Sequence, residues 1–298
     1  MLEAVERKIE QFVADLEDSD AHMLLRRLPA GKRLRARLIL EIAGEGLRAV
    51  KTAAIVEMIH AASLLHDDVL DDAYVRRGRP SINALYDNKT AIMFGDVLYS
   101  KGFYELNDID RDVAKIVSDA VVRLSLGERR DILLATRFNP DRDAYIEMID
   151  LKTAALIQAA AEAAASLAGK PRHIYRTYGR NLGIAFQMID DLLDITQDAE
   201  TLGKPAMHDF VEGKTTLPYI YLFEALNDTD RARLVALHGR KLAQADQAWI
   251  RSQMEHHDAI VRSQNEARGL IEEAIALMEA AGEHSLEAIA RAMIERSF

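Results

Sequence analysis

The sequence predicts an all-α fold, and three observations support this prediction. Gly 15 and Pro 6 are few for a chain of 298 residues, so few positions interrupt regular structure. Stretches such as residues 154–168 are rich in Ala, Leu and Glu, which lose little side-chain freedom in a helix. Apolar side chains also recur at helical spacing along most of the chain. We therefore expect a single large helical bundle.

The first part of the chain contains three expected helices and one irregular stretch. An apolar stripe predicts a helix over residues 2–17, formed by Val5, Ile9, Phe12, Val13 and Leu16. A turn at residues 28–31 precedes a helix over about 33–44, and the next helix runs from 52 to about 71. Residues 72–89 are expected to form a long loop, because Gly78, Pro80 and Asn88 interrupt the pattern.

The rest of the chain continues in the same way. Further helices are expected over residues 90–107, 111–135, 142–168 and 172–195. Residues 196–217 form a second irregular stretch, and residues 219–298 indicate four or five shorter helices. No Ser/Gly linker, low-complexity tract or repeat of fixed period divides the sequence, so one domain over residues 1–298 is predicted.

Composition and charge exclude several classes of protein. The hydrophobic share of 49% is enough for a sizeable core, and Cys 0 excludes a disulfide framework and a thiolate metal site. No apolar run approaches the roughly 18 residues that a membrane span needs, so we expect a soluble, cytoplasmic protein with no transmembrane segment. The net charge of −10 makes nucleic acid an unexpected partner. Basic residues nevertheless cluster at 32–37 and 76–79, which suggests that small anions bind there.

Two aspartate clusters share the pattern DDxxD. Asp67, Asp68 and Asp71 form the first cluster, and Asp190, Asp191 and Asp194 form the second. Because helix positions i and i+4 share a face, the first and last aspartates of each cluster should project together. Their mutual repulsion among apolar neighbours calls for a cation, and hard oxygen ligands in this number suit Mg²⁺.

Two other interpretations of the aspartates fit the sequence less well. Solvated helix ends often carry aspartates, but here each cluster follows an apolar helical run and precedes a basic segment. A di-iron or di-manganese bundle would need Glu-x-x-His pairs, and none accompanies these clusters.

Cationic side chains complete the pattern. Arg76, Arg77 and Arg79 follow the first cluster, and Lys204 and Lys214 follow the second. The turn before the expected helix at 33–44 carries further cations, beginning at Lys32, where free backbone N–H groups favour phosphate. Two matched sets of acidic and basic groups are what binding two diphosphates through metal ions requires.

These motifs resemble those of the trans-isoprenyl diphosphate synthases, also called polyprenyl diphosphate synthases, over roughly residues 28–220. The matching segments are GKRLR at 31–35, HAASLLHDDVLDDAYVRRGRPS at 60–81, GD at 95–96, KTAAL at 152–156, FQMIDDLLD at 186–194 and GKPAMHDFVEGKTTLP at 203–218. The resemblance implies the helical bundle of the isoprenoid synthases with a central active-site cavity, and a homodimer.

The resemblance also implies roles for individual residues. The diphosphate of isopentenyl diphosphate would be held by Lys32, Arg35, His60 and Arg77. The allylic diphosphate would be bound by Arg76, Lys152, Lys204 and Lys214. The six aspartates would bind Mg²⁺, with Asp67 and Asp71 on one wall and Asp190 with its neighbour Asp194 on the other. Thr153 and Gln187 would line the carbocation region. Asp67, Asp71, Lys152, Asp190 and Lys204 would then be the catalytic residues.

The implied reaction is a chain elongation. The allylic substrate loses its diphosphate, the double bond of isopentenyl diphosphate attacks the resulting allylic cation, and a proton leaves to the departing diphosphate. In this family the depth of an apolar tunnel below the first cluster sets product length. Ala62 and Ser63 are small and would leave that tunnel open, whereas Tyr99 and Phe103 are candidates for its floor. We expect a product longer than farnesyl diphosphate, made from a farnesyl or geranylgeranyl primer.

The sequence departs from the family pattern at Met207-His208, where a glycine and a small or acidic residue are usual, so the loop 203–214 is expected to close differently. Three alternatives stay open: a short-chain farnesyl or geranylgeranyl diphosphate synthase, a terpene cyclase, and a non-catalytic subunit of a two-component synthase. The second DDxxD and the GKRLR turn argue against a cyclase, and the presence of all six aspartates argues against a non-catalytic subunit.

Overall fold

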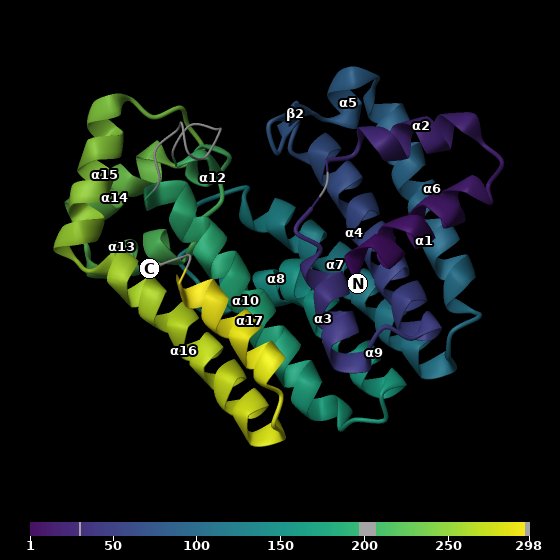
Figure 1. The fold of residues 1–298 in the computed structure, drawn as a ribbon. Helices are drawn as coiled ribbons and strands as arrows, with labels where there is room; N and C mark the ends of the chain where they lie inside the picture. Colours follow the sequence, from purple (N-terminus) through teal and green to yellow (C-terminus); the bar gives the residue numbers. More distant parts are fainter. Residues whose placement is uncertain (30, 197–206, 296–298) are drawn as a thin grey trace. The chain divides into compact units, whose positions relative to one another are not determined.

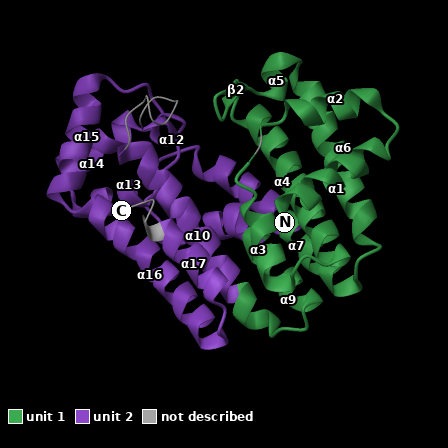
Figure 2. Cartoon of the chain, in the orientation of Figure 1, with its two compact units in different colours: residues 1–121, 156–176 green, residues 122–155, 177–298 purple. Residues whose placement is uncertain are grey.

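The computed structural model describes residues 1–29, 31–196 and 207–295 (Figure 1). In these residues the fold is helical except for a two-stranded antiparallel hairpin, which confirms the predicted all-α class. The chain forms two compact units (Figure 2). Unit 1 comprises residues 1–121 and 156–176, and unit 2 comprises residues 122–155 and 177–298. The single domain expected from the sequence stays a prediction.

Unit 1 is organised around the long helix α4, which packs against α6, α3 and α1. Its apolar centre includes Leu38, Ile39, Ile55, Met58 and Ile59, all fully buried. The elements of this unit are α1 (Leu2–Ala14), α2 (Ser19–Arg27), α3 (Leu34–Ala43), α4 (Leu47–Leu70), β1 (Val75–Arg76), β2 (Arg79–Pro80), α5 (Ile82–Leu85) and α6 (Asn88–Leu106). Three helices have residues in both units: α7 (Arg111–Leu134), α9 (Ala155–Leu167) and α10 (Arg172–Thr196).

Unit 2 is organised around the long helix α16, which packs against α13 and α15, and α17 packs along α16 (Figure 1). Its largest fully buried side chains are Tyr145, Tyr178, Phe210 and Tyr219. Its further elements are α8 (Arg142–Ile149), a π-helical turn (Asp150–Ala154), α12 (His208–Val211), α13 (Leu217–Ala225), α14 (Asp228–Leu237), α15 (Gln244–His256), α16 (Ala259–Ala281) and α17 (His284–Glu295).

The structure corrects four element predictions. Helix α2 was not expected, and the stretch 72–89 holds a hairpin and the short helix α5 where a loop was predicted. Helix α4 begins at Leu47 because Gly46 serves as its N-cap. The helix expected over 142–168 is divided by the π-helical turn. No helix in the described ranges has the length and apolar character needed to cross a bilayer.

Candidate active site

The first aspartate cluster ends helix α4. Asp67 is half-buried and Asp71 is exposed at the helix C-cap, where its N–H donates to the Asp67 carbonyl at 2.9 Å. Asp68 is buried and its carboxylate pairs with the Arg76 guanidinium. Burial raises the pKa of Asp68, and the Arg76 charge opposes that shift. Asp67 and Asp71 are therefore the more accessible members of this cluster.

The hairpin after α4 fixes Arg76 and Arg77. The pairing of Val75 with Pro80 and of Arg76 with Arg79 leaves a two-residue turn at Arg77-Gly78. Both turn residues have positive φ, 52° and 72°, as tight hairpin turns of this hand require. Asn83 donates to the carbonyls of Asp68 at 3.1 Å and Ala73 at 3.2 Å, which ties the hairpin to the end of α4.

A cationic cluster surrounds His60 on α4. Burial lowers the pKa of His60 well below its usual range, and the charges of Arg35 and Arg77 lower it further. Burial also lowers the pKa of Arg35, to about 10, against the opposing charge of Glu57. Arg35 Nε is buried and has no hydrogen-bond partner, as expected of a group arranged for an external anion. A Cβ at Gly31 would lie 2.6 Å from Arg77 Nη1, so glycine leaves room for this guanidinium.

Glu57 organises this cluster, although no sequence motif pointed to it. Its side chain is buried, and it accepts from the N–H of Ala36 at 3.0 Å at the start of α3. It also pairs with Arg33 Nη1 at 3.2 Å, while Arg33 Nε pairs with Glu6 at 2.6 Å. Arg33 thus has a structural role, whereas the neighbouring Lys32 is exposed.

The second aspartate cluster lies on α10 and has one exposed member. Asp190 is exposed, whereas Asp191 and Asp194 are buried. Asp191 accepts from Tyr145 Oη at 2.6 Å and from Gln187 Nε2 at 2.8 Å. Burial raises the pKa of Asp191 to about 8, and the charge of Asp209 adds to the shift. The Asp194 carboxylate accepts from the N–H of Asp209 at 3.1 Å. Asp190 is consequently the member that is presented outward.

A hydrogen-bonded chain connects this cluster to the π-helical turn. Thr153 Oγ1 donates at 2.7 Å to Gln187 Oε1, and Gln187 donates onward to Asp191. Tyr145, which the sequence did not point to, closes the chain from α8. Burial raises the pKa of Tyr145, so its hydroxyl remains a donor. The chain fixes the predicted carbocation-lining residues Thr153 and Gln187 relative to one another.

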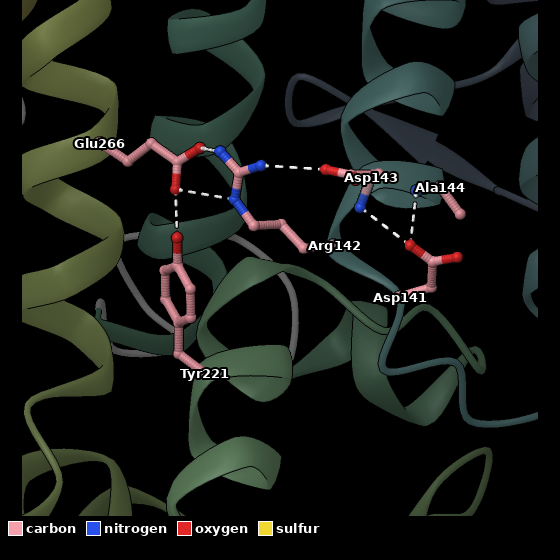
Figure 3. Close-up of polar contacts among 6 residues, drawn as sticks. All are labelled: Asp141, Arg142, Asp143, Ala144, Tyr221 and Glu266. Atoms are coloured by element: carbon pink, nitrogen blue, oxygen red, sulfur yellow. Dashed lines mark hydrogen bonds and ion pairs between the residues drawn. The ribbon is translucent and has the colours of Figure 1, made fainter.

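The start of α8 is held by a second polar network (Figure 3). Arg142 donates to Glu266 on α16, and Tyr221 on α13 donates to the same carboxylate. Asp141 caps α8 by accepting from the N–H groups of Asp143 at 3.0 Å and Ala144 at 3.1 Å. These contacts fix the helix that carries Tyr145.

The π-helical turn that bears Lys152 is packed between two glycines. A Cβ at Gly127 of α7 would lie 2.3 Å from Lys152 N, and one at Gly183 of α10 would lie 2.5 Å from Ala154 Cα. Lys152 Nζ itself contacts Glu128 at 2.7 Å and Asp131 at 2.6 Å. The backbone of the turn therefore occupies space that only glycine on both sides leaves free.

Replacing Gly127 with alanine should displace this turn, because backbone atoms cannot yield as side-chain ends do. We expect a loss of roughly 2 kcal/mol in the free energy of unfolding and a marked loss of turnover. The matched control is Gly269→Ala on α16, where an added Cβ meets nothing within 4 Å. That control should gain up to about 1 kcal/mol. Denaturant unfolding measures the stability of both variants. Equal stabilities would contradict the close approach of Gly127 to the backbone of Lys152.

The remaining predicted residues lie as follows. Lys214 contacts Glu212 at 3.0 Å, and Lys204 lies outside the described residues. At the departure from the family pattern, Met207 is buried with φ 59° and caps α12, and His208 pairs with Glu212 at 2.9 Å.

The predicted chain-length residues lie on α4 and α6. Ala62 and Ser63 are buried, and the Tyr99 ring lies 5.6 Å from that of His66 and 6.3 Å from that of Phe103. The roles given to these positions, and to the other site residues, stay predictions.

Comparison with known proteins identifies the family. Residues 21–255 match the family described as polyprenyl synthetase. The short chain isoprenyl diphosphate synthase of Methanothermobacter thermautotrophicus is 38% identical over 221 residues, which are 70% of this chain and 68% of that protein. Heptaprenyl diphosphate synthase component 2 of Geobacillus stearothermophilus is 34% identical over 285 residues, 93% of this chain and 87% of that protein.

Two solved structures have the same fold as this chain over almost its whole length. The octaprenyl pyrophosphate synthase of Helicobacter pylori has a TM-score of 0.93 and 39% identity, and the match covers 98% of both chains. A polyprenyl synthase from Caulobacter crescentus, complexed with calcium and isoprenyl diphosphate, has a TM-score of 0.88 and 30% identity, covering 100% of this chain and 95% of that one. The chain therefore belongs to the polyprenyl synthetase family and is a prenyltransferase.

Proposed function

We propose that this enzyme condenses isopentenyl diphosphate with an allylic diphosphate in a Mg²⁺-dependent reaction and releases a longer all-trans polyprenyl diphosphate. One observation carries the proposal. Helix α4 bears His60 within a cluster of arginines and, two turns later, the accessible pair Asp67 and Asp71. A single helix thus supplies a site for a diphosphate that is bound by cationic side chains and a site for a diphosphate that is bound through a metal ion.

The cationic cluster suits the diphosphate of isopentenyl diphosphate. Arg35 offers a buried, unpartnered Nε, and Arg77 offers a guanidinium held by its hairpin. A neutral His60 adds a hydrogen bond without a further positive charge. Lys32 is exposed nearby in sequence and would add a mobile charge.

The aspartates fit Mg²⁺ that is shared with a substrate. In the described part of the chain, no three His, Asp or Glu side chains gather closely enough to hold a metal ion by themselves. Mg²⁺ usually takes one or two carboxylates together with water and phosphate oxygens, which is what Asp67 with Asp71, and separately Asp190, can provide. When bound, the ion neutralises charge on the leaving diphosphate. Arg76, Lys152, Lys204 and Lys214 would contact that same diphosphate, which also accepts the proton lost at the end.

A product assay tests the proposal. Purified protein is incubated with Mg²⁺, isopentenyl diphosphate and geranyl, farnesyl or geranylgeranyl diphosphate, and the products are identified by mass. We expect a defined polyprenyl diphosphate longer than farnesyl and no product with excess EDTA. A cyclic hydrocarbon would instead identify a cyclase, and no turnover with any primer would favour a subunit that needs a second component. Termination at farnesyl or geranylgeranyl would establish the short-chain alternative.

Product length is predicted to depend on Ser63. Its side chain is buried on α4 one turn before Asp67, and its small volume is consistent with an open tunnel. Ser63→Phe should shorten the main product by at least one isoprene unit while turnover with the shortest primer persists. Ser63→Ala is the size-matched control and should leave the product unchanged. An unaltered product from the phenylalanine variant would place the tunnel elsewhere.

We also propose that two copies of the chain form a homodimer. Helix α6 exposes Ile92, Met93 and Tyr104, of which Tyr104 is 67% exposed. Exposed large apolar side chains on one helix are consistent with an association surface. Size-exclusion chromatography with light scattering tests this, and a monomeric mass at micromolar concentration would refute it.

A further inference from the structure

The segment that carries Lys214 is fixed on both sides of this residue. Helix α12 ends in a Schellman motif, in which Gly213 N–H donates to the Phe210 carbonyl at 3.1 Å and Lys214 N–H donates to the Asp209 carbonyl at 2.8 Å. Gly213 has φ 88°, and a Cβ there would lie 2.6 Å from the Ala135 carbonyl oxygen. Only glycine fits at this position, so the backbone enters Lys214 in one conformation.

His238, beyond the end of α14, contacts both neighbours of Lys214. Its Nε2 lies 3.1 Å from Thr215 Oγ1. It also donates a hydrogen bond to the Gly213 backbone, whose acceptor group is the carbonyl oxygen, and this bond opposes the lowering of its pKa by burial. The imidazole is packed edge-on against Phe138 at 5.4 Å and Phe210 at 5.3 Å between ring centroids.

The polar groups of this cluster satisfy one another in a single arrangement. Burial lowers the pKa of His238, so the ring is neutral and has one N–H donor and one acceptor nitrogen. The ring N–H donates a hydrogen bond to the Gly213 carbonyl, and the acceptor Nε2 accepts a hydrogen bond from the Thr215 hydroxyl. Thr215 Oγ1 in turn accepts from the N–H of Asn139 at 3.2 Å, so the hydroxyl is also fully engaged.

We infer that His238 is a positioning residue that fixes Lys214 for diphosphate binding by clamping Gly213 and Thr215. The inference rests on the proposed function, in which Lys214 contacts the allylic diphosphate. It assigns a role to a residue that is 24 positions beyond Lys214 in the sequence and that touches no substrate itself. His238 acts through two hydrogen bonds, so an aromatic ring without nitrogen should not replace it.

His238→Phe tests this, because phenylalanine keeps an aromatic ring between Phe138 and Phe210 but removes both hydrogen bonds. We expect KM for the allylic diphosphate to rise about tenfold with a smaller change in kcat, which lies within the net contribution of two hydrogen bonds. Calorimetric titration with inorganic diphosphate and Mg²⁺ should show a similar loss of affinity. Thr215→Val should behave alike, and Thr215→Ser should recover most of the affinity. The control His256→Phe makes the same exchange at an exposed position on α15 and should change nothing.

A double-mutant cycle with Lys214→Met separates positioning from general damage. If His238 acts through Lys214, His238→Phe should weaken diphosphate binding less than twofold in the Lys214→Met background. An unchanged KM in His238→Phe, or an equal loss in both backgrounds, would overturn the inference. The proposed function is tested separately by the product assay. It is refuted only if the wild-type enzyme does not elongate any allylic primer.

Discussion

Replacing Asp190 with alanine is expected to lower kcat by about three orders of magnitude or more, with the helical content unchanged. Asp190 is the exposed member of its cluster. Asp191 and Asp194 are buried, and both accept hydrogen bonds from other groups of the protein. A lost metal ligand removes charge stabilisation from the departing diphosphate, which is a large contribution to the rate. Asp67→Ala should have an effect of similar size, because Asp68 is already paired with Arg76. Steady-state kinetics and circular dichroism measure the two effects.

The Mg²⁺ dependence distinguishes a lost ligand from a damaged fold. Residual activity of Asp190→Ala should saturate at a higher Mg²⁺ concentration than that of the wild type. Asp119→Ala removes an exposed aspartate in the middle of α7 and serves as the control, with activity within about twofold. Near-normal turnover of either cluster variant would refute the metal assignment.

The sequence was sufficient for the class of fold and for the position of both clusters. The i, i+4 spacing predicted that Asp67 with Asp71, and Asp190 with Asp194, share a helix face. In the structure Asp71 is the C-cap of α4, and Asp194 is buried whereas Asp190 is exposed. Which aspartates are accessible could not be predicted, because accessibility depends on distant partners. Asp191 is held by Tyr145, 46 residues away, and Asp194 by the backbone of Asp209.

The missed elements have similar explanations. Helix α2 has 9 residues and is largely polar, so it is shorter than the roughly 11 residues over which helical periodicity can be recognised. Its start is set by the side chain of Asp18, which accepts from Ala21 N–H. The π-helical turn depends on the close approach of Gly127 and Gly183, which no local pattern reveals. The hairpin was the one element with a local signal, since Arg77-Gly78 is a two-residue turn with glycine at its second position.

The arginines of segment 31–35 show how one basic motif divides into two roles. Arg33 is held by Glu6 and Glu57, and these carboxylates raise its pKa despite burial. Arg35 lies two residues later, and burial lowers its pKa to about 10. The charge of Glu57 opposes this shift, and the like charge of Arg77 adds to it. A buried charged group that the fold itself destabilises is often part of a ligand-binding site.

Opposite effects are therefore expected from the same substitution at these two positions. Arg35→Met should raise KM for isopentenyl diphosphate about a hundredfold, while the midpoint of thermal unfolding stays the same or rises, because a disfavoured buried charge is removed. Arg33→Met should instead lower the free energy of unfolding by roughly 2 kcal/mol, since it leaves the buried Glu57 without its ion-pair partner. Thermal unfolding and steady-state kinetics of both variants distinguish a role in diphosphate binding from a role in stability. A large loss of stability in Arg35→Met with an unchanged KM would show that this arginine supports the fold and does not bind the diphosphate.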